Sequence, residues 1–418
     1  MTATRGDGHG ASGVVWMGPA YDRGGYGAVT RNYVRGLARI GFPVKLLPYG
    51  PQHAEINGDV ASELRSLERA PVGSSPALVV HGTPESFGFA PPFGFVRRIG
   101  CTIFETDRLP QHWIAPCNSM DEVWVPSHFN IDTFTRAGVD AAKLATIPYG
   151  IDTSQYTPSG MERTERPFTF LYVCAFNWRK GLDLLLESFL NEFHRGEARL
   201  VMRVYSEGYQ GVAADEVERV LYESVDGRVE KAVDERPEVR IITQAQSFAD
   251  LKLLYESADL YISTDRANGW GVPCQEAMAL GVPAATIDWS GSTEFMHEDN
   301  SVLIHPEDEL VPVDPRLADA LPELYAGHRW ARVEPTAVRR AMRWALENPV
   351  QLAAIARAGQ KHVRSALGLE DVARRVVDRL STLEPSVTQR AVGAARLYAL
   401  WTHAVRLRSR RALGRGQA

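Results

Sequence analysis

The sequence predicts an α/β protein made of two parallel sheets that helices cover. Short apolar runs alternate along the chain with longer stretches of helical periodicity, and this alternation stops at one polar segment and then begins again. Such alternation is typical of parallel sheets, because each crossover between parallel strands carries a helix. The chain has 418 residues, which is enough for two such domains and a smaller helical part.

The first series of strands and helices fills the N-terminal part of the chain. The apolar run at 14–17 predicts a strand, and the helical periodicity at 28–40 predicts the helix that follows it. Residues 152–166 lack apolar periodicity and are rich in Ser, Thr, Pro and charge, as interdomain linkers are. We therefore expect a first domain over 1–155. Its further strands are expected at 44–47, 77–80, 101–104, 122–125 and 145–147.

A second series of the same kind predicts a second domain over 167–365. Its strands are expected at 168–174, 200–204, 239–242, 260–263 and 284–287. From residue 315 onward the pattern is almost purely helical, and Pro or Asp stands near the first turn of each predicted helix. The C-terminal part, 366–418, is expected to form helices that pack back on the first domain and to end in a basic tail. The predicted helices are 315–325, 335–346, 349–367 and 371–383.

Composition excludes several classes of protein. Lys and Arg number 46 against 51 Asp and Glu, a formal charge of -5, so no basic field favours nucleic acid as a partner. The four cysteines form no C-x-x-C pair, which indicates neither a zinc site nor a disulfide framework and fits a reducing cytosol. We find no apolar run of about 18 residues and no secretory leader, so we expect a cytoplasmic protein.

The first Gly-rich loop, GPAYDRGGYGAVTRN, follows the first strand. Ligands of open α/β sheets bind beyond the carboxyl ends of the strands, and glycines there let backbone approach a ligand. The next helix can direct its N-terminal amides at polar or anionic groups. As a dinucleotide fingerprint the loop fails at Thr30, so a nicotinamide-dependent oxidoreductase is disfavoured. The alternative is a tight turn with no ligand.

The most informative stretch is DRANGWGVPCQEAMALGVP, which follows the strand LYIS. Gly269 and Gly271 keep its turn bare, and Pro273 stands where a helix begins, so amides near Val272 can cradle a phosphate. Glu276, one turn into the helix, can accept two sugar hydroxyls of a ribose. The alternative is an ordinary strand, turn and helix with a surface glutamate.

Arg179 and Lys180 end the strand that opens the second domain, in CAFNWRKGLDLLLESF. Two cations beside a helix N-terminus suit a diphosphate, because they neutralise charge that develops on a leaving group. A solvated pair of cations is the alternative.

These motifs, in this order, resemble the retaining nucleotide-sugar glycosyltransferases of family 4, which have the GT-B fold of two Rossmann-like domains facing an interdomain cleft. The resemblance covers most of the chain. It implies transfer of a hexosyl group from a nucleoside diphosphate sugar to an acceptor hydroxyl with retained configuration. It rests on the first Gly-rich loop, DEVWVPSHFNIDTFTRAGV with IPYGID, RKGLDLLLESF, and LYESADLYISTDRANGWGVPCQEAMALGVP with TIDWSGSTEF.

The resemblance assigns donor residues one by one. The second glutamate of the family's donor loop falls on Glu276, whereas the first falls on Asn268, so a neutral amide stands where the family contacts the sugar. Of the family's phosphate-binding pair, Lys180 matches the lysine but Ala175 holds the arginine position, and we hypothesise that Arg179 partly substitutes. The implied donor contacts are Asn268, Gly269, Trp270, Gly271, Val272, Glu276, Lys180 and Glu294.

His81, in LVVHGTPESF, resembles the histidine that faces the reaction centre in relatives. Together with Arg179, Lys180 and Glu276 it makes the expected catalytic set, and a structural histidine is the alternative. Glu105 and Asp107 also end a strand and can bind or deprotonate an acceptor hydroxyl, or cap the following turn. The expected acceptor contacts are Gly25, Tyr26, Gly27, Glu105 and Asp107.

No cofactor is expected beyond the donor substrate, and no metal, because cations and helix amides meet the diphosphate and no D-x-D motif ends a strand. A GT-B phosphorylase or sugar-phosphate synthase is a rival interpretation. A nucleotide-binding scaffold without catalysis is another, motivated by Asn268. The segment 387–415 carries seven arginines among apolar residues, which predicts either peripheral membrane contact or a helix packed on the first domain.

Overall fold

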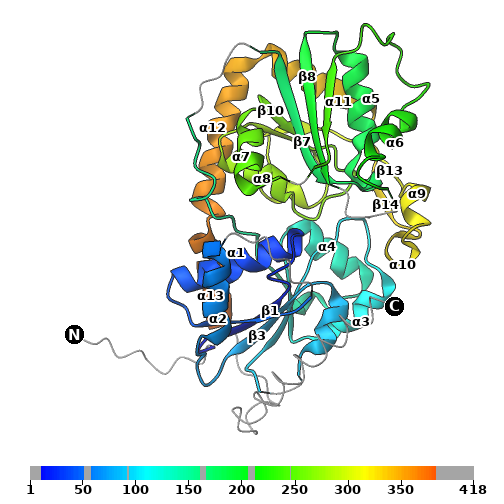
Figure 1. Cartoon of the computed structure of the whole chain (residues 1–418). Helices are drawn as coiled ribbons and strands as arrows, with labels where there is room; N and C mark the ends of the chain where they lie inside the picture. The colour runs from blue at the N-terminus through cyan, green and yellow to red at the C-terminus, as the bar shows by residue number, and fades with distance from the viewer. Residues whose placement is uncertain are drawn as a thin grey trace. The chain divides into compact units, whose positions relative to one another are not determined.

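The chain divides into two compact units, each a sheet covered by helices (Figure 1). The first unit takes in the described residues up to Ile103, the segment Gln111–Asp152 and the described residues from Ala366 onward. The second takes in Phe104–Pro110 and the described part of Thr153–Ser365. The structure is a computed structural model and describes residues 11–50, 58–91, 94–160, 166–205, 212–244 and 246–382.

The first unit contains a six-stranded parallel sheet in the order β2-β1-β3-β4-β5-β6. Every residue of β1 and β3 is buried, as expected of central strands covered on both faces. The strands are β1 (Val14–Gly18), β2 (Val44–Pro48), β3 (Ala77–His81), β4 (Arg98–Cys101), β5 (Glu122–Val125) and β6 (Leu144–Thr146). The helices are α1 (Gly25–Arg39), α2 (Gly58–Arg69), α3 (Gln111–Ser119), α4 (His128–Ala137) and α13 (Leu369–Ser381), with short 3-10 helices η1 (Pro84–Phe89) and η2 (Ala141–Lys143).

Strand β4 lies three residues before the position predicted at 101–104. Its sequence, RIGC, has a charged residue and a glycine where apolar residues normally mark a strand. Gly100 is required there because the ring of Phe87 fills the space of a side chain, and a Cβ would come within 2.4 Å of it. Because Phe87 fills this space, the strand has a glycine where an apolar residue would have marked it in the sequence.

The C-terminal helix α13 belongs to the first unit and packs on α1. A Cβ at Gly36 would come within 2.6 Å of the Leu369 carbonyl oxygen, so the two helices touch through backbone. The guanidinium of Arg379 pairs with the buried carboxylate of Glu122 at the start of β5. The basic segment 387–415 and its predicted membrane contact lie outside the described residues.

The second unit contains another six-stranded parallel sheet, in the order β12-β11-β10-β7-β8-β9. Its strands are β7 (Phe168–Ala175), β8 (Ala198–Tyr205), β9 (Glu238–Ile242), β10 (Leu260–Ile262), β11 (Ala284–Ile287) and β12 (Val302–Ile304). Its helices are α5 (Leu182–Glu192), α6 (Val217–Ser224), α7 (Phe248–Glu256), α8 (Val272–Ala279), α9 (Pro315–Ala318), α10 (Pro322–Tyr325), α11 (Pro335–Glu347) and α12 (Pro349–Ala366), with 3-10 helices η3 (Trp178–Lys180) and η5 (Gly291–Glu294).

The prediction of almost pure helix after residue 315 holds for the described residues except for one short strand and a break in the first helix. Strand β14 (Arg329–Ala331) pairs antiparallel with β13 (Leu310–Pro312). The predicted helix at 315–325 is two short helices, α9 and α10, because Pro322 begins the second and cannot donate the hydrogen bond that a continuous helix needs. Three-residue strands are too short to show a period in the sequence.

The segment Phe104–Pro110 follows β4 of the first sheet but belongs to the second unit. The ring of Phe104 stacks on Tyr325 at 6.0 Å between centroids. The Thr106 hydroxyl lies 2.7 Å from Nδ1 of His328, and Asp107 Oδ1 accepts the Arg329 amide at 2.7 Å. The segment is thus bonded to the β13–β14 hairpin and α10.

Each sheet has one point at which the strand order reverses. In the first sheet, β2 and β3 lie on opposite sides of β1, and in the second, β8 and β10 lie on opposite sides of β7. Loops that leave neighbouring strands at such a point diverge, and the crevice between them is where open α/β sheets bind ligands. The loops after β1 and β3, and those after β7 and β10, carry most of the predicted site residues.

Candidate donor and acceptor sites

Two loops of the second unit, after β10 and after β11, are bonded to each other through backbone. The amide of Gly291 donates to the Asn268 carbonyl at 2.7 Å, and the Asn268 amide donates to Ser290 Oγ at 2.9 Å. A Cβ at Gly291 would lie 1.7 Å from the Gly269 carbonyl oxygen, so only glycine allows this approach. The predicted donor loop is therefore one half of a fixed pair of loops.

Ser290 has φ 73° and ψ -157°, a backbone conformation that only glycine adopts readily. It is the one residue other than glycine with positive φ in the described part of the chain. Its hydroxyl accepts the Asn268 amide, a hydrogen bond that a glycine at this position could not make. Sequence reasoning missed Ser290, and no sequence signal marks such a strain.

Helix α8 begins at Val272, directly after Gly271, whose φ is 97°. Pro273 stands in its first turn, as predicted, and Val272 is half-buried there. On the next turn Glu276 accepts hydrogen bonds from the hydroxyls of Tyr156 at 2.6 Å and Tyr255 at 2.8 Å. Burial raises the pKa of Glu276 above its usual value, and the two tyrosine hydroxyls oppose that shift.

Asn268 and Trp270 face the loop interior. The Asn268 side chain is 6% exposed, and its Oδ1 accepts the Trp270 amide at 3.3 Å, which folds the loop on itself. The Trp270 ring is buried against Phe295, at 4.8 Å between centroids, and its Nε1 donates to Gln275. Both the amide and the ring of Trp270 are thus engaged within the second unit. Glu294 lies half-buried at the end of η5.

Arg179 and Lys180 are each paired with a carboxylate of the same unit. Lys180 Nζ lies 2.6 Å from Asp265 Oδ2, and Arg179 Nη2 lies 3.0 Å from Glu105 Oε1. Arg179 Nη1 also donates to the Ala267 carbonyl in the donor loop at 2.7 Å. The two cations are 12% and 17% exposed, so they are not a solvated pair. Both lie at the reversal point of the second sheet.

A network missed by sequence reasoning holds the turn that carries these cations. Arg266 donates to the Trp178 carbonyl and to Asp183, each at 2.9 Å. The guanidinium of Arg316 lies over the Trp178 ring, 3.5 Å from its centroid. Although burial opposes it, Arg266 and Arg316 hold the pKa of Asp183 below its usual value. These residues are far apart in the chain, so no local motif connects them.

His81, in the first unit, is 0% exposed. Its Nδ1 lies 2.8 Å from Thr30 Oγ1, and the rings of Trp16, Tyr33 and Tyr149 lie within 6.2 Å of its own, centroid to centroid. Burial lowers its pKa to about 3, so the ring is neutral at pH 7. The structure thus gives His81 the surroundings of a structural histidine, and Thr30, which breaks the dinucleotide fingerprint, is its partner.

The first Gly-rich loop is partly structural and partly open. Helix α1 begins at Gly25, three residues before the predicted start, and Asp22 Oδ1 accepts the Gly24 amide at 2.5 Å. A Cβ at Gly27 would come within 2.2 Å of the Asp22 carbonyl oxygen, whereas one at Gly25 meets nothing within 4 Å. The Tyr26 hydroxyl lies 3.3 Å from Thr102 Oγ1.

Comparison with known proteins finds a family match over the part of the chain that contains most of the predicted donor residues. Residues 167–326 match the family model described as "Glycosyl transferases group 1". This part of the second unit is similar to that family. The matched range contains Arg179, Lys180, the loop 265–271, Glu276 and Glu294, but not Tyr156 or Glu105.

Solved structures that are similar over most of the chain extend the likeness beyond residues 167–326. HepE from Anabaena in complex with UDP has 14% identity and a TM-score of 0.57, covering 89% of this chain and 100% of that one. Sucrose-phosphate synthase from Thermosynechococcus elongatus is 16% identical with a TM-score of 0.61, and the match covers 88% of this chain and 98% of that one. The E. coli trehalose-6-phosphate protein bound with UDP-2-fluoro glucose is 11% identical with a TM-score of 0.62, and the match covers 90% of this chain and 100% of that one. The predicted GT-B fold class is confirmed.

One curated relative is a subunit of the phosphatidylinositol N-acetylglucosaminyltransferase of Arabidopsis thaliana. It is 22% identical over 207 residues, 49% of this chain and 43% of that protein. The alignment thus spans less than half the length of the curated relative it matches.

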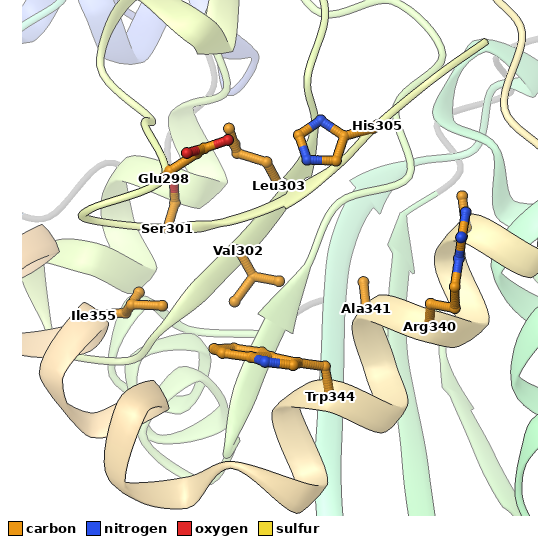
Figure 2. Close-up of a pocket in the computed structure, with 10 residues that line it drawn as sticks. Glu298, Ser301, Val302, Leu303, His305, Arg340, Ala341, Trp344 and Ile355 are labelled. Carbon is orange, nitrogen blue, oxygen red and sulfur yellow. The ribbon is translucent and has the colours of Figure 1, made fainter.

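One hollow of the second unit is lined by none of the predicted site residues. It has a volume of about 490 Å³ and lies between β12 and the helices α11 and α12. Figure 2 shows Trp344 beneath Val302, with Arg340 and His305 at the rim. Among the described residues, no cluster of three or more His, Cys, Asp or Glu suits a metal ion, and no helix is long and apolar enough to cross a membrane. All four cysteines are buried and free.

Proposed function

We propose that this chain is a retaining hexosyltransferase of family 4, which moves a hexosyl group from a nucleoside diphosphate sugar to an acceptor hydroxyl. The observation that carries the proposal is the fixed loop pair that ends at α8, with Glu276 oriented by two tyrosines one turn into that helix. The match of residues 167–326 to the group 1 family model supports it, and so do the similar structures solved with UDP or UDP-2-fluoro glucose.

The donor is assigned to the second unit. Glu276 would accept hydroxyls of the ribose, and the amides from Gly269 to Val272 would meet the phosphates at the start of α8. When the bond between the anomeric carbon and the phosphate oxygen breaks, negative charge develops on the departing diphosphate. Lys180 and Arg179 would stabilise that charge in a site with little water.

The acceptor is assigned to the open part of the first Gly-rich loop and to the segment after β4. Gly25 leaves space for a ligand, and Tyr26 and Gly27 shape the same turn. Asp107 is engaged by the Arg329 amide and Glu105 by Arg179, so either carboxylate would have to exchange partners to reach a hydroxyl. His81 supports this loop through Thr30, and a direct catalytic role would require its buried ring to become accessible.

We further propose that the reaction needs no metal or cofactor, because Lys180, Arg179 and helix amides meet the diphosphate. Transfer that continues at full rate in EDTA would support this, and loss of transfer that Mg²⁺ restores would contradict it. We also propose a cytoplasmic protein without a nucleic-acid partner. Peripheral membrane contact through 387–415 is tested by liposome sedimentation with and without residues 385–418, where equal pelleting removes the idea.

Turnover tests the proposal directly. The purified chain is incubated with UDP-, GDP-, dTDP- and ADP-sugars and a panel of hydroxyl acceptors, and release of nucleotide is measured with Glu276→Ala as control. We expect release from one donor class and an NMR spectrum in which the product keeps the donor's anomeric configuration. An inverted linkage would contradict the family 4 assignment.

A second candidate is a sugar-phosphate synthase or phosphorylase, favoured by the names of two neighbours. The same donor site would serve it, but the acceptor would carry phosphate. Faster nucleotide release with a sugar phosphate or inorganic phosphate than with any neutral acceptor would select it. If the chain binds a nucleotide but turns over no donor with any acceptor, a scaffold without catalysis is the remaining interpretation, with Asn268 as the first residue to revert to glutamate.

A further inference from the structure

The carboxylate of Glu105 forms an ion pair with Arg179, one of the two cations that the proposed function assigns to the donor diphosphate. Its Oε1 is 3.0 Å from Arg179 Nη2, and the two side chains are 19% and 12% exposed. Both residues belong to the second unit, although Glu105 follows β4 of the first sheet. A cation this far removed from water needs an anion beside it, and Glu105 supplies one.

Arg179 is the fixed member of this pair. Its Nη1 donates to the Ala267 carbonyl at 2.7 Å, its amide donates to Asn177 Oδ1 at 2.9 Å, and its carbonyl accepts the Arg266 amide at 2.8 Å. The carboxylate of Glu105, by contrast, has Arg179 as its one partner among the described residues. An exchange of anions would therefore move Glu105 and leave the guanidinium in place.

The neighbouring pair, Lys180 with Asp265, is built differently. Asp265 is 4% exposed and also accepts a hydrogen bond from the hydroxyl of Tyr172, which lies inside the central strand β7. Two donors and nearly complete burial fix that carboxylate, so Asp265 has no route away from Lys180. Of the two carboxylates that neutralise the predicted diphosphate cations, Glu105 is the one that can leave.

We propose that Glu105 occupies the place of a donor phosphate on Arg179, and that a nucleoside diphosphate binds by displacing it. The inference rests on the proposed function and adds to it a residue that sets donor affinity. Because the ion pair must break before the phosphate can bind, its free energy opposes donor binding. Displacement also releases a carboxylate beside the donor loop, where it becomes available to a substrate hydroxyl.

The test compares the dissociation constant of UDP, measured by calorimetry, for the full chain and four variants. Glu105→Gln keeps the shape of the side chain and removes its charge, and we expect it to tighten UDP binding about fivefold, the scale of a partly buried ion pair. Glu347→Gln removes the same charge from an exposed side chain that lies 4.0 Å from Arg343, and it should leave UDP affinity unchanged. Arg179→Ala should weaken binding.

The fourth variant combines Arg179→Ala with Glu105→Gln and identifies the cause. If Glu105 acts through Arg179, Glu105→Gln should raise UDP affinity by less than twofold in a chain that already carries Arg179→Ala. Unchanged or weaker UDP binding in Glu105→Gln, or an equal gain without Arg179, overturns the inference while leaving the donor site intact. Failure of the wild-type chain to bind UDP, GDP, dTDP or ADP overturns the donor site and this inference together. Thermal unfolding of each variant confirms that it is folded.

Discussion

The hydroxyl of Tyr156 donates to Oε1 of Glu276 at 2.6 Å, across 120 positions of sequence. Tyr156 comes from the polar segment between the two series of strands, and Glu276 from the second turn of α8. Tyr255, on α7, donates to the other oxygen at 2.8 Å. The carboxylate proposed for the ribose is thus held at both oxygens before any ligand arrives.

Removing one of these hydroxyls should weaken donor binding without unfolding the protein. In Tyr156→Phe the carboxylate loses one orienting hydrogen bond, worth about 1 kcal/mol, so UDP should bind about fivefold more weakly. Tyr21→Phe is the matched control, because Tyr21 donates to Glu68 at 2.5 Å in the first unit. Equal UDP affinities in wild type and Tyr156→Phe would show that this hydrogen bond does not prepare the site.

The strain at Ser290 separates two effects on stability. Ser290→Ala and Ser290→Gly both lose the hydrogen bond to the Asn268 amide, but only glycine relieves the positive φ. We expect the alanine variant to be less stable than the glycine variant by about 1 to 3 kcal/mol in denaturant unfolding. If the two variants unfold at the same denaturant concentration, the backbone there is not strained.

Buried histidines make the fold sensitive to acid. Burial lowers the pKa of His81 to about 3 and that of His328 to about 4. Below pH 6.5 the unfolded chain binds protons that the native chain does not, so the free energy of unfolding falls as pH falls, by up to about 1.4 kcal/mol per pH unit for each histidine. Denaturant titrations between pH 7 and pH 5 measure this slope.

His81→Asn should reduce that slope, whatever it does to stability at pH 7. His328→Asn should do the same independently, because the two histidines lie in different units. A slope that neither substitution changes would assign the acid sensitivity to other groups.

Substitution by alanine should affect stability differently at Gly25 and at Gly27. Gly27→Ala forces a Cβ against the Asp22 carbonyl oxygen and should destabilise the fold by about 1 to 3 kcal/mol. Gly25→Ala adds a methyl group to open space, so stability should change by no more than about 0.5 kcal/mol. If the acceptor approaches this loop, Gly25→Ala should still slow transfer while leaving UDP affinity unchanged. Full transfer activity in Gly25→Ala would place the acceptor elsewhere.

Much of the fold could be predicted from sequence because its cause is local. The apolar run of β1 predicts a buried strand, and Gly271 before α8 predicts the turn at which that helix begins. The position of strand β4 was predicted three residues too late, because Phe87 fills the space of the side chain that Gly100 lacks. The hairpin of β13 and β14 was missed because three-residue strands leave no period.

The candidate site divides in the same way. The predicted positions of Glu276, Arg179 and Lys180 follow from loops after strands, which a sequence shows. Their partners, Tyr156 and Glu105, lie far away in the chain and have no motif of their own. The surroundings of His81 also depend on distant rings, so its burial could not be distinguished from a catalytic role.

The most direct test of the donor site is the melting temperature of the purified chain with UDP, GDP, dTDP or ADP, compared with Glu276→Ala. A ligand stabilises the state that it binds, so one nucleotide at about 100 times its dissociation constant should stabilise the wild type by about 2.7 kcal/mol. The account predicts that this nucleotide raises the melting temperature of the wild type and not that of Glu276→Ala. An equal rise in both proteins, or no rise with any of the four nucleotides, would contradict it.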